Sequence, residues 1–159
     1  MLLLALSGCG LQQDVSALPP GAAGAPTPAP PITGALLDGS AFKWSAVQGR
    51  PVVIDFWASW CGPCRAEQQD INTVYAEYAK RGVAFIGVDM RDDDASANAY
   101  RHDYSVQYPS IADSSEQVSA DYNVAAPPTI VVVNQQGLIV QRLLGTAVGL
   151  SAELDHLLS

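Results

Sequence analysis

The chain has 159 residues, of which 48 % are hydrophobic, and a formal net charge of −8 at pH 7. This length suits one domain of ordinary size, which can bury a sizeable core without disulfides or metal ions to hold it together. The acidic balance argues against nucleic acid as a partner, because a phosphate backbone requires a basic surface, and no apolar stretch is long enough to span a bilayer.

The first nine residues, MLLLALSGC, form a short apolar run that meets small residues and ends at Cys9. Residues 6–9, LSGC, resemble the lipobox of bacterial lipoproteins, in which the chain is cut before the cysteine and the cysteine carries the lipid. No Lys or Arg precedes the apolar run, which is also shorter than the apolar part of a full export signal. We interpret residues 1–9 as the remnant of a lipoprotein signal with Cys9 as the lipidation site. A frayed apolar terminus with an unused cysteine is the alternative.

Residues 10–31 are rich in Pro, Ala and Gly, and six of the eleven prolines of the chain lie between Pro19 and Pro31. Such a composition buries too little apolar surface to offset the entropy of ordering it, so we expect a disordered linker. Its prolines favour an extended spacer, which is what a tether between a lipid anchor and a folded domain requires.

Residues 32–159 are expected to form the folded domain. Apolar and β-branched runs predict strands at 35–37, 42–44, 52–57, 83–88, 129–133 and 138–143, the last two as a hairpin across 134–137. Apolar spacing and end signals predict helices at 63–80, 94–104, 114–122 and 151–158, with Ser151 capping the last. This order predicts an α/β fold in which a parallel strand–helix–strand unit joins the central strands and an antiparallel hairpin lies beside them.

Cys61 and Cys64 fall between a predicted strand and the following predicted helix, in the stretch DFWASWCGPCRAE. A helix N-terminus offers unpaired N–H groups and the positive end of the helix dipole, and both favour a thiolate. Gly62 and Pro63 permit the tight entry into the helix, and Cys64 follows one turn later. We therefore predict a redox-active disulfide pair with Cys61 as an exposed nucleophile and Cys64 as the resolving thiol, and no other cofactor.

Two other roles for the pair are open from the residues alone. A structural staple would close a loop of only four residues and would constrain the unfolded chain little. A tetrahedral zinc site needs three or four ligands. The further candidate ligands are Cys9, in the predicted signal remnant, and His102 and His156, which are lone residues in polar helical surroundings. We therefore predict no metal.

Two motifs resemble a known fold. WCGPC at residues 60–64, after VVIDFWAS, resembles the active site of thioredoxin-fold proteins, and AAPPTIVVV at residues 125–133 resembles the cis-proline loop and strand of that fold, with Pro128 as the cis-proline. The cysteine run, the extra helical insert around 94–104 and the stretches FIGVDMRDDD, YPSIAD and VNQQG are most similar to the membrane-anchored TlpA/ResA-like thioredoxins. The resemblance covers residues 32–159. It implies a thioredoxin-like fold, with a central mixed β-sheet flanked by helices and an extra helical insert.

The resemblance also implies roles for residues around the cysteines. Asp55 matches the buried acid that moves the proton of the resolving Cys64, and a carboxylate in an apolar strand should have a raised pKa on physical grounds too. Trp60 is expected to flank the disulfide and the substrate, and Pro128 to lie beside the two sulfurs. An ordinary strand-end Asp and a core-packed Trp are the alternatives. The predicted substrate-binding set is completed by Gly62, Pro63 and Pro127.

Three features depart from the thioredoxin pattern. The strand AFIGVD carries no Lys to face the buried acid, so Asp55 is expected to be harder to ionise. No proline follows the CxxCxxE run closely, so we expect a straighter helix. Pro127 has no N–H, which leaves only its carbonyl to bond a substrate chain and predicts weaker or differently shaped docking.

The leading hypothesis is an enzyme, an extracytoplasmic thiol–disulfide oxidoreductase of the protein-disulfide reductase type, lipid-anchored at the outer face of the bacterial cytoplasmic membrane. The resemblance implies that it reduces disulfides in exported proteins, with apocytochrome c and cytochrome c biogenesis as typical targets, and that a membrane thiol–electron donor recharges it. An oxidant of the same fold and a lipoprotein that only binds clients are the alternatives. A peroxidase is a further rival, but the sequence lacks a Pro-x-x-x-Thr/Ser-x-x-Cys arrangement around Cys61.

Overall fold

The computed structural model describes residues 26–159. The predicted signal remnant, its lipidation site Cys9 and most of the predicted linker fall outside this range. Among the described residues, no helix combines the length and the apolar character needed to cross a membrane.

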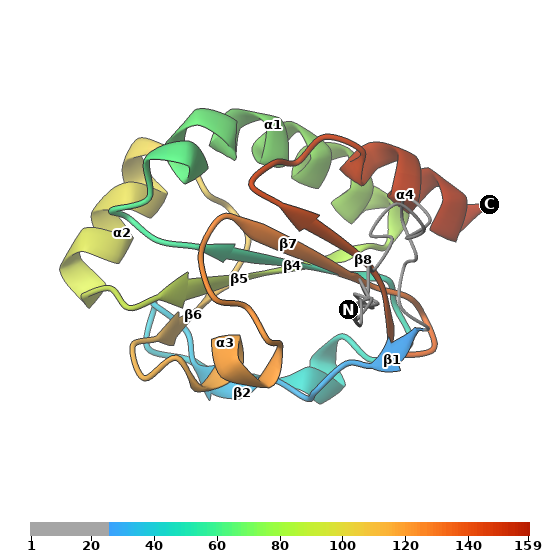
Figure 1. Ribbon diagram of the computed structural model, residues 1–159, viewed down its shortest axis with the longest axis horizontal. Coiled ribbons are helices and arrows are strands. Elements are labelled where there is room, and N and C mark those ends of the chain that lie inside the picture. The colour runs from blue at the N-terminus through green and yellow to red at the C-terminus, as the bar shows by residue number, and fades with distance from the viewer. Residues whose placement is uncertain (1–25) are drawn as a thin grey trace, which may run out of the picture.

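A six-stranded mixed sheet forms the centre of the fold (Figure 1), with the strand order β1-β8-β7-β4-β5-β6. Its strands are β1 (Thr27–Pro28), β4 (Val52–Trp57), β5 (Ala84–Met90), β6 (Ser110–Asp113), β7 (Thr129–Val133) and β8 (Leu138–Leu144). Strand β4 pairs with β5, and β5 with β6, in parallel, whereas β4 pairs with β7, and β7 with β8, in antiparallel fashion. A separate small sheet is formed by β2 (Thr33–Ala35) and β3 (Ala41–Lys43). The predicted thioredoxin-like mixed sheet is confirmed.

Helices cover both faces of this sheet. They are α1 (Gly62–Tyr78), α2 (Asp94–Asp103), α3 (Gln117–Asp121) and α4 (Leu150–Leu158), with short 3-10 turns η2 (Trp44–Ala46) and η3 (Ala79–Arg81). Helices α1, α2 and α4 lie on one side of the sheet, and α3 lies on the other side with β2 (Figure 1). Helix α1 joins the parallel strands β4 and β5, which is the crossover that the sequence predicts.

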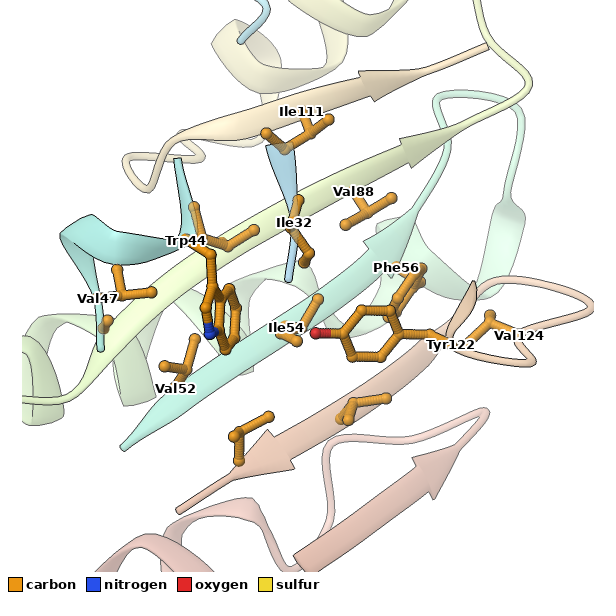
Figure 2. Packing of buried hydrophobic residues seen from close by; sticks show 14 of the residues in the cluster. Ile32, Trp44, Val47, Val52, Ile54, Phe56, Val88, Ile111, Tyr122 and Val124 are labelled. Atoms are coloured by element: carbon orange, nitrogen blue, oxygen red, sulfur yellow. The ribbon is translucent and has the colours of Figure 1, made fainter. Parts of the chain in front are cut away.

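Alternate residues of β4 enter two separate cores, because successive side chains of a strand point to opposite faces. Val52, Ile54 and Phe56 pack with Trp44 and Tyr122 on the α3 side of the sheet (Figure 2). This core contains no cysteine. This core holds one face of β4 in place, and the opposite face of the strand packs toward α1 and the cysteines.

The second core lies between the sheet and α1. Val53 and Trp57 of β4 pack there together with both cysteines of the CxxC pair. Asp55 lies between these two residues in the strand and is itself buried. The alternation of β4 therefore directs its only carboxylate into the core beneath α1.

Three sequence expectations about the elements are wrong. The predicted linker should be disordered as far as Pro31, yet β1 pairs with β8 and the Tyr122 hydroxyl donates to the Pro30 carbonyl at 2.7 Å, so its last residues belong to the fold. Ser151 does not cap α4, whose N-cap is Gly149 at a positive φ of 93°. Strand β6 was not expected at all; it is short and is defined by its pairing with β5.

Candidate active site

Cys61 and Cys64 form a disulfide at the start of α1, with an S–S distance of 2.00 Å and a Cα–Cα distance of 5.3 Å. Cys61 is the N-cap residue of the helix, and its sulfur accepts the backbone N–H of Cys64 at 3.1 Å. Pro63 lies in the first turn, where a missing N–H costs no helical hydrogen bond. The sequence thus folds locally so that the first sulfur takes the place of a capping oxygen.

This capping position favours negative charge on Cys61. The Cys64 N–H donates to the sulfur, and the positive end of the dipole of a 17-residue helix lies at the same position. A thiolate formed there on reduction would be stabilised, and thiolates rather than thiols attack disulfides. The predicted division of roles between the two cysteines therefore has a geometric basis.

The expectation that the attacking sulfur is exposed is wrong for the disulfide form. Cys61 is 3 % exposed and Cys64 is 2 % exposed. The neighbouring Trp60 is 49 % exposed, and Gly62 and Pro63 are exposed as well. In the disulfide form these three neighbours are therefore the exposed residues that a partner meets here.

Trp60 is held by a loop that follows β5, a contact for which the sequence carries no local signal. Its indole N–H donates to the Arg91 carbonyl at 3.2 Å, and the Arg91 guanidinium lies over the ring at 5.4 Å from its centroid. Arg91 is also paired with Glu116 at 2.9 Å. One residue before Trp60, the Ser59 N–H donates to an Asp92 carboxylate oxygen at 2.6 Å. The loop thus fixes the approach to Cys61 from one side.

Asp55 is buried in β4, on the face of the strand that packs against α1. Its Oδ2 accepts a hydrogen bond of 2.6 Å from the Tyr108 hydroxyl, whereas its buried Oδ1 has no partner among the described residues. Burial raises the pKa of Asp55 to about 7; the Tyr108 hydrogen bond opposes this rise, and the negative charge of Glu67 adds to it. The expected raised pKa is confirmed, and it puts the proton of this carboxyl near its midpoint at neutral pH.

Glu67 is a second acidic residue on α1. From the sequence it stands out only as part of the cysteine motif. It is half-buried, and its Oε1 is buried without a hydrogen-bond partner in the described part of the chain. Burial is the main cause that raises the pKa of its carboxyl, and a hydrogen bond from the Ala147 backbone opposes the rise. Its position one turn after Cys64 is the signal that could have identified it.

The peptide bond between Pro127 and Pro128 is cis, so the prediction of Pro128 as the cis-proline is confirmed. The loop lines a groove of about 660 Å³ that Leu144 and Gly145 border on the β8 side. The Gly145 N–H donates to the Pro128 carbonyl at 2.9 Å, which ties the loop to the end of β8. Leu144 is exposed, so the groove has an apolar rim where a client chain could lie.

The described residues offer few candidate metal ligands. Across residues 26–159, no three His, Cys, Asp or Glu side chains are grouped so that they could hold a metal ion. His102 is exposed and contacts the neighbouring Asp103 at 3.1 Å.

Among the solved structures that resemble this one are two that are named for thiol–disulfide chemistry. A secreted disulfide oxidoreductase of Mycobacterium tuberculosis, 27 % identical, superposes with a TM-score of 0.71 over 79 % of this chain and 96 % of that one. A thiol:disulfide interchange protein of the thioredoxin family from Chlorobium tepidum TLS, 25 % identical, gives 0.76 over 84 % and 97 %. With a disulfide that caps the first long helix, this likeness puts the chain in the class of thioredoxin-fold thiol–disulfide oxidoreductases.

The sequence comparison narrows this class. Residues 22–157 match the family model described as Redoxin, and the chain belongs to the Redoxin family. Thiol-disulfide oxidoreductase ResA from Geobacillus kaustophilus (strain HTA426) is 30 % identical over 110 residues, which are 69 % of this chain and 63 % of that protein. ResA from Bacillus subtilis (strain 168) is 28 % identical over 109 residues, 69 % of this chain and 61 % of that protein. The TlpA/ResA-like resemblance is confirmed, and the chain spans less than two thirds of the length of these relatives.

Proposed function

We propose that this chain catalyses thiol–disulfide exchange with protein disulfides, with Cys61 as the nucleophile and Cys64 as the resolving thiol. The observation that carries the proposal is the position of the Cys61 sulfur, which caps α1 and accepts the Cys64 N–H at 3.1 Å. A thiolate at this point is stabilised by the helix N-terminus, so Cys61 ionises more readily than a cysteine inside the helix.

In the reductive direction, the Cys61 thiolate attacks one sulfur of a client disulfide, and the other client sulfur leaves as a thiolate. Cys64 then gives its proton to Asp55 and attacks the Cys61 sulfur, which breaks the mixed disulfide and releases the second client thiolate. The client gains two electrons, and the enzyme is left with a Cys61–Cys64 disulfide.

Asp55 suits the role of proton acceptor because the pKa of its buried carboxyl is raised to about 7. A group with a midpoint near the working pH can both accept and release a proton. A client chain would touch the exposed Trp60, Gly62 and Pro63. It would also touch the loop of Pro127 and Pro128, in which Pro127 is partly exposed and Pro128 is buried.

We further propose that the protein works as a reductant outside the cytoplasm, anchored through Cys9 to the outer face of the bacterial cytoplasmic membrane. Its clients would be exported proteins that carry disulfides, such as apocytochrome c, and a membrane thiol–electron donor would restore the dithiol. Support comes from the signal-like N-terminal sequence, from the likeness to ResA proteins and from the likeness to a secreted disulfide oxidoreductase.

Insulin reduction by dithiothreitol tests the catalytic proposal. The wild-type protein should accelerate insulin precipitation, and Cys61→Ser should remove the acceleration entirely; retained acceleration would refute the nucleophile assignment. Cys64→Ala should hold clients in a mixed disulfide that only added thiol releases, whereas release without thiol would indicate a binding module.

The reduction potential of the pair, measured at equilibrium with glutathione, tests the direction. A potential well below that of the glutathione couple would support a reductant. A potential above it would indicate an enzyme that forms disulfides.

A further inference from the structure

A buried chain of hydrogen bonds leads to Asp55 from residues that the catalytic proposal does not use. The Tyr108 hydroxyl donates to Asp55 Oδ2 at 2.6 Å, and Gln68 Nε2 donates to that hydroxyl oxygen at 2.9 Å. The Tyr100 hydroxyl in turn donates to Gln68 Oε1 at 3.0 Å. Tyr108, Gln68 and Tyr100 are all buried, although they come from three different parts of the chain.

The direction of every donor in this chain is fixed. A hydroxyl has one proton, so a Tyr108 that donates to the carboxylate must accept from its other neighbour. That neighbour must present its amide nitrogen, and Gln68 therefore turns its Nε2 to Tyr108 and its Oε1 to Tyr100. Gln68 Nε2 also donates to Asn72 Oδ1 at 3.1 Å, which uses its second proton. Each hydrogen-bond donor, from Tyr100 through Gln68 to Tyr108, is thus directed toward Asp55.

Among residues 26–159, we find no cationic side chain that stabilises the Asp55 carboxylate. The charged side chain that acts on Asp55 among the described residues is Glu67 on α1, and its charge opposes ionisation. The sheet neighbours of Asp55 are Gly87 on β5 and Ile130 on β7, which carry no charge. The Arg65 guanidinium donates to the Ser59 carbonyl through Nε at 3.1 Å. The favourable interaction with the carboxylate therefore comes from a hydroxyl.

We propose that Tyr108 is the positioning residue for Asp55: its hydroxyl holds the carboxylate in place and favours the ionised form, while Gln68 and Tyr100 fix the direction of that hydroxyl. The functional importance of these hydrogen bonds rests on the proposed role of Asp55 as the proton acceptor for Cys64.

The titration of Asp55 tests the inference without reference to activity. The carboxyl carbon of Asp55, followed by NMR against pH in the oxidised protein, reports its ionisation while neither cysteine titrates. Tyr108→Phe removes a hydrogen bond to a charged group and should raise the midpoint by about one pH unit or more. Tyr100→Phe leaves Tyr108 in place but frees the amide of Gln68, and should give a smaller shift of the same sign.

Tyr75→Phe is the matched control. Its ring packs edge-on against Tyr108, with centroids 5.5 Å apart, and it also loses one hydroxyl. It should leave the midpoint of Asp55 where it is in the wild type. An unchanged or lower midpoint in both Tyr108→Phe and Tyr100→Phe would overturn the inference, and so would an equal shift in Tyr75→Phe. If Tyr108→Phe does not fold, Tyr100→Phe decides alone.

A kinetic readout separates this inference from the proposed function. The release of glutathione from a Cys61–glutathione mixed disulfide follows the attack of Cys64, and its pH–rate profile should move with the midpoint of Asp55. A shifted Asp55 midpoint with an unshifted rate profile would uphold the role of Tyr108 and refute Asp55 as the proton acceptor.

Discussion

Asp55→Asn should stabilise the oxidised protein at pH 8 and leave it nearly unchanged at pH 4. The substitution keeps the shape of the side chain and an oxygen that can accept the Tyr108 hydrogen bond. What it removes is the negative charge, which at high pH must be held in a core formed by the sheet and α1. The gain in stability is therefore expected to depend on pH.

The magnitude follows from the two pKa values. Folding raises the pKa of Asp55 from 3.8 to about 7. Between these values the folded state binds a proton that the unfolded state has released, so wild-type stability falls as the pH rises through this window and is level above it. Each pH unit of the gap is worth about 1.4 kcal/mol, so the wild type loses ~4 kcal/mol at most, and Asn loses none of it.

Urea unfolding at pH 4, 6 and 8 measures this difference. The free energy of unfolding of the variant should exceed that of the wild type by an amount that grows at each step. Asp121→Asn, at an exposed carboxylate on α3 whose hydrogen bond from Gln117 an Asn oxygen can also accept, is the control and should show no such trend. An Asp55→Asn effect of equal size at pH 4 and pH 8 would refute the argument from a buried charge.

Three further substitutions test other contacts. Gly87→Ala should lower the free energy of unfolding by about 1–3 kcal/mol, because a methyl group there would collide with Ser110 and with a neighbouring indole nitrogen; an unchanged urea midpoint would contradict this packing. Arg91→Ala removes the guanidinium over the Trp60 ring and should increase the motion of that indole in NMR relaxation, with unaltered relaxation as the contrary result. Asp89→Asn should stabilise the fold at pH 9 but not at pH 4, because burial raises the pKa of this carboxyl to about 8; thermal unfolding at the two pH values decides.

The parts of the fold that carry strong local signals were predictable from the sequence. Strand β4 is a continuous apolar run after a proline, and its observed bounds, Val52–Trp57, are those predicted. Strand β6 escaped prediction because its four residues carry no alternation of their own and depend on pairing with β5. Strand β1 was not predicted for a related reason. Its Pro-rich sequence is typical of a linker, and the segment is a strand only because it pairs with β8.

The site was predictable as far as it is encoded in motifs. The CxxC pair, Asp55 and the cis-proline at Pro128 were all placed from short sequence runs. The contacts around them join residues that are far apart in the chain, such as Tyr108 and Asp55 at a separation of 53. One local signal was available: Gln68 is a polar residue on the buried stripe of α1, four residues after Cys64, and a buried amide must find partners.

Two buried carboxylates lie on the α1 side of adjacent parallel strands, and their surroundings separate their roles. Asp55 on β4 receives a hydroxyl donor, and the pKa of its carboxyl is raised to about 7, so it can exchange a proton at neutral pH. Burial, and then the negative charge of Asp92, raise the pKa of the Asp89 carboxyl on β5 to about 8, which favours its protonated form at neutral pH. Asp92 in turn accepts the Ser59 N–H in the loop that leads to Cys61. Burial raises the pKa of both carboxyls, and the donor beside Asp55 and the acid beside Asp89 then act in opposite directions.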